Sequence, residues 1–336
     1  MAKTHLTLAA LATSAVAGLD VVQTSNFGSG THGDFDSALL TARDGRHWII
    51  RMPTSERAEA EQSADLVALR ALSTGIRARL PFTVSSFAGQ APIRDTRAVV
   101  YEFVYGTKVS LAAIRPGEAL ASSIGRAIAA IHTLPTSFVS DAGLPVLTPD
   151  ELRSASVAVM DRASATGLVP AALLRRWESA AEDSALWQFA PTVVNGAVAA
   201  DSFLSADDAV AGVIGWQALS VGDPARDLYW LLGAHTEGVA ETAFDAYNLA
   251  RGSSDRQIKQ RAMLYAELEI AKWLLHGMQE RNTEIVDDAV EMLHTLVDTV
   301  QNDLNQNISH NTMPVMAVDE VEAMLEQRNP PASPPA

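Results

Sequence analysis

The first hundred residues alternate apolar and polar positions in short runs, a pattern typical of β-strands. One stretch, residues 56–74, has the apolar spacing of an amphipathic helix instead, with Leu66, Leu69 and Leu72 on its inner face. The predicted strands cover residues 19–25, 36–42, 47–53, 82–87 and 97–104. We therefore expect a five-stranded antiparallel sheet with one helix packed against it.

The N-terminal twenty residues carry an apolar run that fits either a signal peptide or a buried helix. A single Lys, the run itself and Ala15-Val16-Ala17 imitate a secretory signal. Thr and Ser interrupt the run, which favours a helix packed on the first sheet. Its predicted contacts are Leu6, Leu8, Leu11 and Val16. No other segment approaches the length of a membrane span, so we predict a cytoplasmic protein without a membrane partner.

Beyond residue 106 the apolar period becomes helical. Ile124, Ile128 and Ile131 share one face of a helix that ends at a Pro. Further helices are predicted over residues 149–165 and 170–182. Two short strands follow, at residues 192–196 and 211–216, and the chain after them is predicted to be helical to about residue 303.

These elements divide the chain into two lobes and a tail. Residues 1–105 form the β-rich lobe, with a hinge near residues 101–106, and residues 107–303 form the mainly helical lobe. Residues 304–336 form a flexible, Pro-rich tail with a short amphipathic helix over residues 317–328, which is a candidate surface for a protein partner. The order of elements predicts an α+β, protein-kinase-like bilobal fold.

Composition removes several classes of function. The chain has 336 residues and no Cys, which excludes disulfides, thiolate metal sites and a Cys nucleophile. The net charge is −15, with 25 basic and 40 acidic residues. Such an acidic surface disfavours nucleic acids and anionic membranes as partners.

A set of spaced motifs lies around the two short strands of the helical lobe. In chain order they are Asn195-Gly196-Ala197, Ser202, Leu204, Ile214-Gly215-Trp216 and Asp223-Pro224-Ala225-Arg226-Asp227. With the stretches at residues 44–53, 79–84, 130–135 and 141–144, this pattern resembles the aminoglycoside phosphotransferase family, and within it the macrolide phosphotransferase branch. The resemblance spans about residues 6 to 300.

The resemblance also shows where the chain departs from the family. It implies a catalytic Asp where Ala197 stands, metal ligands where Ser202 and Gly215 stand, and a His in place of Asn195. Ala and Gly offer no base or metal ligand, and a Ser hydroxyl is a poor substitute for an imidazole. We therefore expect a degenerate site with no metal ligands, in which Asp223 and Asp227 act as capping and loop-bracing groups.

Three functional interpretations follow. The first is a pseudokinase that acts by binding, with a small molecule as a candidate ligand. The second is an active phosphotransferase that uses a non-standard residue, for which Asp201 is the candidate. The third is an interaction module that binds no nucleotide.

The resemblance places nucleotide contacts in the small lobe and the hinge. No Lys lies between Lys3 and Lys108, so Arg51 takes the place of the third-strand lysine. Asp65 is the first candidate for its acidic partner on the helix, and Glu61 is the second. Base contacts are expected from the main chain of the hinge residues Tyr101, Glu102, Phe103 and Val104. Any bound GTP or ATP is expected to bind weakly and independently of Mg²⁺.

Overall fold

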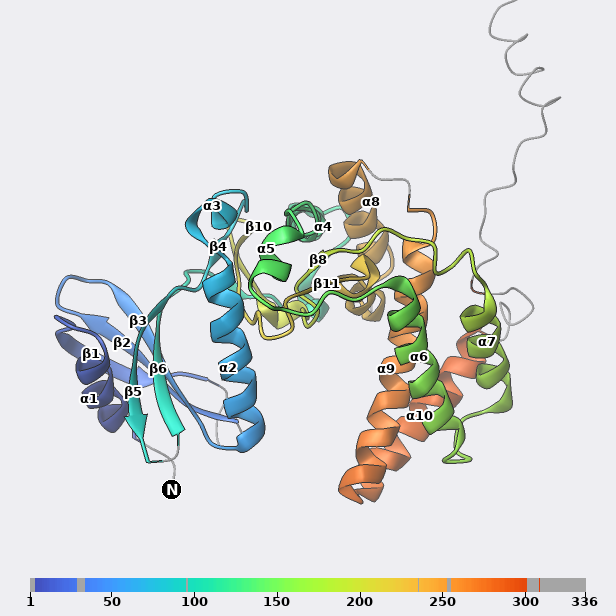
Figure 1. The fold of residues 1–336 in the computed structure, drawn as a ribbon, viewed down its shortest axis with the longest axis horizontal. Coiled ribbons are helices and arrows are strands. Elements are labelled where there is room, and N and C mark those ends of the chain that lie inside the picture. The colour runs from blue at the N-terminus through green and yellow to red at the C-terminus, as the bar shows by residue number, and fades with distance from the viewer. Residues whose placement is uncertain are drawn as a thin grey trace, which may run out of the picture.

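The computed structural model describes residues 4–28, 34–94, 96–234, 236–252, 255–300 and 308. Their helices and strands form two lobes, a smaller β-rich one and a larger, mainly helical one (Figure 1). The expected bilobal α+β architecture is confirmed.

The sheet of the small lobe has five strands, as predicted, and all its neighbours are antiparallel. In spatial order the strands are β1 (Val21–Asn26), β2 (Phe35–Ala42), β3 (His47–Pro53), β6 (Thr96–Glu102) and β5 (Phe87–Ile93).

The single strand predicted over residues 82–87 is divided between two strands of different sheets. Residues Thr83–Val84 form β4, which pairs in parallel with β10 (Ala209–Val213) of the large lobe. The small-lobe strand β5 begins only at Phe87. The guanidinium of Arg77 accounts for the break, because its Nη1 donates to the carbonyl oxygens of Val84 and Ser85, both at 2.9 Å. These carbonyls are therefore directed toward a side chain instead of a neighbouring strand.

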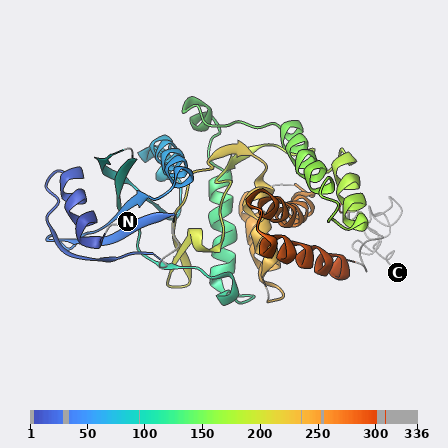
Figure 2. The same ribbon diagram turned by 90° about the horizontal axis from the view of Figure 1, so that it is seen from below.

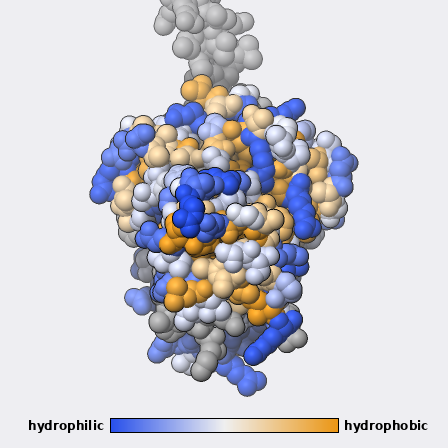
Figure 3. Space-filling model, turned by 90° about the vertical axis from the view of Figure 1, so that its left-hand side faces the viewer, coloured by the Kyte–Doolittle hydropathy of each residue, from blue (hydrophilic) through white to orange (hydrophobic). Residues whose placement is uncertain are grey.

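Helix α1 (His5–Ala15) covers one face of the sheet, which confirms a packed N-terminal helix. Leu8 and Ala12 are buried against this face, whereas Leu6 is 66% exposed, so the predicted contact for Leu6 is wrong. Residues two positions apart point to nearly opposite sides of a helix, so Leu6 and Leu8 cannot share one buried stripe. The space-filling view of this end of the molecule shows hydrophilic and hydrophobic residues mixed over its surface (Figure 3).

Helix α2 (Glu56–Ala71) packs on the opposite face of the sheet and is followed by α3 (Thr74–Arg77). Helix α2 starts at Ser55, whose hydroxyl accepts the N–H of Ala58. Leu66, Leu69 and Leu72 are all buried, as the spacing predicts.

The large lobe consists of helices around two small sheets. The helices are α4 (Ala119–His132), α5 (Ser137–Asp141), α6 (Pro149–Ser164), α7 (Ala171–Glu182), α8 (Val239–Arg251), α9 (Ile258–Glu280) and α10 (Thr283–Val300). One sheet has the order β4-β10-β9-β7, with β9 at Phe203–Ala206 and β7 at Thr107–Lys108, and the other pairs β8 (Thr192–Val194) with β11 (Ser220–Gly222). Figure 2 shows α9 and α10 beside each other at the end of the lobe.

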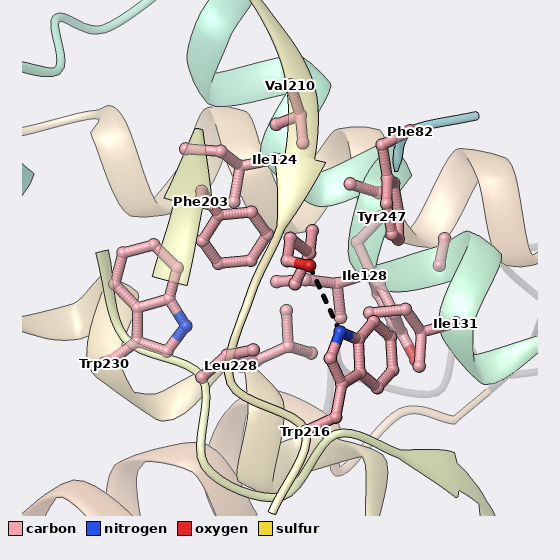
Figure 4. Packing of buried hydrophobic residues seen from close by; sticks show 14 of the residues in the cluster. Phe82, Ile124, Ile128, Ile131, Phe203, Val210, Trp216, Leu228, Trp230 and Tyr247 are labelled. Atoms are coloured by element: carbon pink, nitrogen blue, oxygen red, sulfur yellow. Dashed lines mark hydrogen bonds between the residues drawn. The ribbon is translucent and has the colours of Figure 1, made fainter. Parts of the chain in front are cut away.

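One hydrophobic core connects the lobes. Its centre contains Trp216, Phe203 and Trp230 facing Ile124 and Ile128 of α4 (Figure 4). The same cluster continues to the side chains of α2 and β6 in the small lobe. The strands and turns that carry the motifs are therefore held in place because side chains such as Phe203 and Trp216 are buried in this core.

In the part of the chain that the structure describes, no helix has the length and apolar character needed to cross a membrane. The predicted helix over residues 317–328 lies outside the described residues.

Candidate functional site

The loop between β8 and β9 is held by a buried carboxylate. Asp227, which is fully buried, accepts the backbone N–H of Asn195 at Oδ2 and that of Gly196 at Oδ1, both at 2.7 Å. Gly196 has a φ of +81°, and a β-carbon there would lie 2.6 Å from the carbonyl oxygen of Ala218, so no other residue fits this turn. Asp227 has the loop-bracing role that the sequence indicates.

Two further buried polar groups extend this bracing. His132 at the end of α4 contacts Asp227 Oδ2 through Nε2 at 3.1 Å and the Tyr247 hydroxyl through Nδ1 at 2.9 Å. Asp223 accepts the N–H of Ala225 and, through Oδ2, the Nε of Arg261 at 2.7 Å. Both aspartates of the motif at residues 223–227 are thus engaged in the scaffold.

The turn that contains Gly215 is held from two sides. On one side, Asn195 Nδ2 donates to the Gly215 carbonyl oxygen at 2.8 Å. On the other, Asp65 of α2 accepts the backbone N–H of Trp216 at 2.8 Å. The Trp216 indole N–H donates to the Val213 carbonyl at 3.1 Å, as the dashed line in Figure 4 shows. The turn keeps a defined conformation through protein contacts alone.

The polar groups of the loop point to the loop itself or to solvent. Ser202, in a short 3₁₀ turn over Ala200–Ser202, accepts the N–H of Ala199 at Oγ at 3.2 Å. Ala197 donates its N–H to the side-chain oxygen of Asn195 at 3.2 Å. Asp201 is exposed and forms an ion pair with Lys108 of β7 at 3.6 Å.

This arrangement does not fit a magnesium ion. Mg²⁺ requires carboxylate or other oxygen ligands at one point. Among the described residues no cluster of three or more His, Asp or Glu side chains could hold a metal. Ala197 and Gly215 have no ligand atom in their side chains, and the hydroxyl of Ser202 is engaged by Ala199.

The predicted ion pair between Arg51 and an acid of α2 is absent. Arg51 places its guanidinium over the Phe35 ring, 3.9 Å from the centroid, and forms no ion pair with Asp65 or Glu61. Glu61 accepts instead from Arg57 at 3.0 Å. The Asp65 carboxylate instead accepts the backbone N–H of Trp216.

Burial controls the protonation of this region. Desolvation raises the pKa of the Asp65 carboxyl, and the Trp216 N–H, the charge of Arg51 and the Tyr101 hydroxyl partly offset that rise. Burial, together with the nearby Asp65, also raises the pKa of Tyr101. Arg51 of β3, Asp65 of α2 and Tyr101 of β6 therefore form one electrostatic group.

The hinge main chain forms hydrogen bonds with the small lobe, and the hinge side chain of Val104 packs closely against the large lobe. Glu102 donates its N–H to Ser86 and Phe103 to His47, whereas the N–H of Val104 has no backbone acceptor among the described residues. Val104 packs on β10, where a β-carbon at Gly212 would lie 2.3 Å from its Cγ1. An aromatic cluster surrounds the hinge and consists of Phe27, His47, Phe103 and Tyr105.

One residue of this site has no counterpart in the sequence-based prediction. Gln217 is half-buried, and its Oε1 lies 3.4 Å from the point where a β-carbon on Gly215 would stand. The only signal in the sequence is a polar residue directly after Trp216, which is too common to identify a site.

The fold and this loop-and-turn geometry define a bilobal protein of the kinase-like class. A model of the phosphotransferase enzyme family matches residues 27–265. The chain belongs to this family.

Solved structures share the fold at low sequence identity. The apoenzyme of the macrolide 2'-phosphotransferase MphH from Brachybacterium faecium has a TM-score of 0.71 at 20% identity, over 86% of this chain and 98% of that one. A GDP and kanamycin complex of APH(2")-IIIa has a TM-score of 0.70 at 17% identity, over 89% and 100%. The uncharacterized protein YcbJ of Bacillus subtilis (strain 168) is 22% identical over 277 residues, 76% of this chain and 87% of that protein.

Proposed function

We propose that this chain is a catalytically impaired, pseudokinase-type member of the phosphotransferase family that acts by binding. The observation that carries the proposal is that the polar side chains of the loop contact other protein groups. Asn195 holds the Gly215 turn, Ser202 holds the loop, and Asp201 pairs with Lys108 in solvent.

The expected loss of reaction rate without a catalytic base and metal ligands supports this proposal. Phosphoryl transfer depends on a group that orients the attacking hydroxyl and on metal ions that neutralise the developing charge. Loss of a general base lowers a rate by about 10²–10⁴-fold. Loss of a metal removes several kcal/mol more of charge stabilisation. No side chain at Ala197 or Gly215 replaces either effect.

Groups at the hinge and on β3 support the proposal of residual nucleotide binding. The Val104 N–H has no backbone acceptor in the described part of the chain, and main-chain hydrogen bonds do not depend on the side chains that have changed. Arg51 carries a positive charge on β3 and has no ion-pair partner among the described residues. We propose that GTP or ATP binds here weakly and independently of Mg²⁺.

The alternative of an active enzyme that uses Asp201 receives little support. Its carboxylate is 69% exposed and paired with Lys108, which is 59% exposed. Surface pairs of this kind hold a side chain only loosely. In the described part of the chain, Asp201 belongs to no group of three or more acidic or His side chains that could hold a metal.

Nucleotide titration with and without Mg²⁺ tests the binding proposal. We expect weak saturable binding of GTP or ATP that is unchanged by the metal, measured by calorimetry. Binding that tightens strongly with Mg²⁺ would show that a carboxylate holds the ion after all. Absence of any binding would favour the nucleotide-free interaction module.

A labelled-phosphate assay tests the catalytic proposal. Because the structural neighbours include a macrolide phosphotransferase and a kanamycin complex, the panel contains macrolides and aminoglycosides. We expect no turnover above background, and steady turnover of any panel member would contradict the proposal. Calorimetry with the same panel tests whether the large lobe still binds such molecules.

A further inference from the structure

A cavity of about 340 Å³ lies in the small lobe, away from the motif loop. Its lining residues come from the end of α1 with the segment after it, within residues 16–20, and from the turn between β2 and β3, within residues 42–48. The sheet lies between α1 and α2 (Figure 1), so it separates this cavity from Asp65. The volume falls within the range of small-molecule sites, about 300–1,000 Å³.

The two segments that line the cavity are held in place by main-chain contacts. The N–H of Arg43 donates to the Asp20 carbonyl oxygen at 2.9 Å, which ties the turn between β2 and β3 to the segment after α1. A β-carbon on Gly89 of β5 would collide with the carbonyl oxygen of Ala15, so the end of α1 rests directly on the sheet. The shape of the cavity is therefore set by the fold.

Two arginines that line the cavity have unused terminal nitrogens. Arg43 pairs with Asp20 at 2.5 Å and Arg46 pairs with Asp44 at 2.7 Å, in each case through Nε. The terminal nitrogens of both guanidinium groups make no hydrogen bond to the described residues. The two side chains are 73% and 66% exposed, so these donors are open to a ligand.

The acceptors of the lining are more fully engaged than its donors. Asp44 accepts the backbone N–H of Arg46 at Oδ1 and its Nε at Oδ2, so both carboxylate oxygens are in use. Trp48 adds a donor, because its buried indole N–H has no hydrogen-bond partner among the described residues. An excess of donors favours an anionic ligand, and a carboxylate matches the geometry of a guanidinium group.

Much of the remaining lining is apolar and consists of Val16, Leu19, Ala42 and the ring of Trp48. The guanidinium of Arg46 lies over that ring, 5.1 Å from its centroid. Charged donors and apolar walls therefore meet in one cavity. A molecule with a carboxylate head and an apolar body uses both, because the body gains free energy when it leaves water.

We propose that this cavity binds a small carboxylate with an apolar body. The head group accepts from the terminal nitrogens of Arg43 and Arg46, and the body packs against Val16, Leu19 and the Trp48 ring. Binding moves Arg46 relative to this ring, so Trp48 reports on the ligand. The proposal is independent of nucleotide binding, because no lining residue belongs to the motif loop or the hinge.

Calorimetry on the full chain compares hexanoate with hexan-1-ol and hexylamine, which share its apolar body. We expect saturable binding of hexanoate and at least about tenfold weaker binding of the other two, because only the carboxylate pairs with a guanidinium group. The net charge of −15 works against this order, so a preference for the anion must come from a local site. Equal binding of the three molecules would overturn the proposal.

Variants of the two arginines test the head-group contacts. Arg43→Gln and Arg46→Gln should each weaken hexanoate binding about tenfold, the effect of losing one hydrogen bond to a charged group. Both side chains are exposed, so the variants should fold, which urea unfolding checks. Arg79→Gln, at an exposed position outside the cavity, is the matched control and should bind as the wild type does.

Tryptophan fluorescence locates the ligand. Hexanoate should change the fluorescence of the wild type, and this change should be absent from Trp48→Phe. A change that persists in Trp48→Phe would place the ligand elsewhere and overturn the proposal. Absence of saturable hexanoate binding by the wild type would overturn it as well, as would an equal loss of affinity in Arg46→Gln and Arg79→Gln.

Discussion

The backbone at residue 215 is suited to a residue without a β-carbon. Gly215 has a φ of +77°, in the left-handed region, and its would-be β-carbon meets only the Gln217 amide. Asp and Asn tolerate this region better than other side chains do. A carboxylate could therefore be restored here at an acceptable strain.

We predict that the site is restored in part by three changes made together, Ala197→Asp, Ser202→His and Gly215→Asp. Each single change should have little effect, because catalytic groups that act as a unit are non-additive. The triple variant should lose about 1–2 kcal/mol of stability through the turn at residue 215. It should gain Mg²⁺-dependent nucleotide binding, measured by calorimetry with and without the metal.

Turnover of the triple variant should stay below that of an intact enzyme, since about 1 Å of misplacement can lower a rate 10²-fold. A variant that folds well and shows no metal-dependent binding would contradict the prediction. That result would mean that the three restored side chains do not assemble a metal site.

Asp227 gives a second prediction at the level of a single residue. Asp227→Asn replaces one acceptor oxygen with a donor that faces the N–H groups of Asn195 or Gly196. We expect a loss of about 3 kcal/mol in the free energy of unfolding, measured with urea. Amide exchange at residues 195 and 196 should accelerate. The exposed Asp141→Asn is the control, and equal stability of the two variants would contradict this role.

At the scale of elements, α4 and α8 depend on one glycine for their contact. A β-carbon at Gly125 would lie 2.1 Å from the carbonyl oxygen of Ala243 in α8, so the two backbones must separate if it is added. We predict that Gly125→Ala lowers the free energy of unfolding by about 2–3 kcal/mol in urea titrations.

Gly75→Ala in α3 is the matched control for this change. Gly75 has no atom within 4 Å of its would-be β-carbon, so the variant should be neutral or more stable by about 0.4–1 kcal/mol. Equal losses for both variants would show that helix packing is not the cause.

The sequence was most informative where apolar spacing was long and regular. The helices that carry Leu66 or Ile128 were predicted because several turns repeat the same face. The strand predicted over residues 82–87 was not resolved into β4 and β5, because two residues give no period and the partner of β4 lies in the other lobe. The apolar pattern of a short segment cannot show which distant strand it will pair with, because tertiary contacts determine that pairing.

The same distinction applies to the site. Ala197, Ser202 and Gly215 were singled out only through the family resemblance of the motif that contains them. The contacts that replaced the expected ones were not predictable, because Asp65 and Trp216 are far apart in the chain and meet only in the fold. Arg51 was expected to pair with an acid, but the side chain of Phe35 lies closer to it.

At the scale of the whole molecule, Asp65 links the lobes and makes their contact sensitive to pH. Its folded-state pKa is raised, mainly by burial, above the value of about 3.9 of an unfolded chain. The folded state therefore binds the proton more tightly, and stability increases as the pH falls through the folded-state pKa.

We predict that the wild type gains stability relative to Asp65→Asn as the pH falls from 7 toward 4, measured by urea unfolding. Asn cannot titrate and so lacks this gain. The exposed Glu56→Gln on the same helix serves as the control. A difference between wild type and Asp65→Asn that stays flat or moves in the opposite direction would contradict the prediction.

The parallel pairing of β4 with β10 determines the order in which the chain can be completed during synthesis. Residues 83–84 leave the ribosome with the small lobe, but their partner strand emerges only after α4, α5, α6 and α7 have been made. Until then the segment after α3 has no strand beside it. We therefore expect the pairing of β4 to be completed only after β10 has been made, and a fragment cut at the hinge would contain β4 without its partner strand.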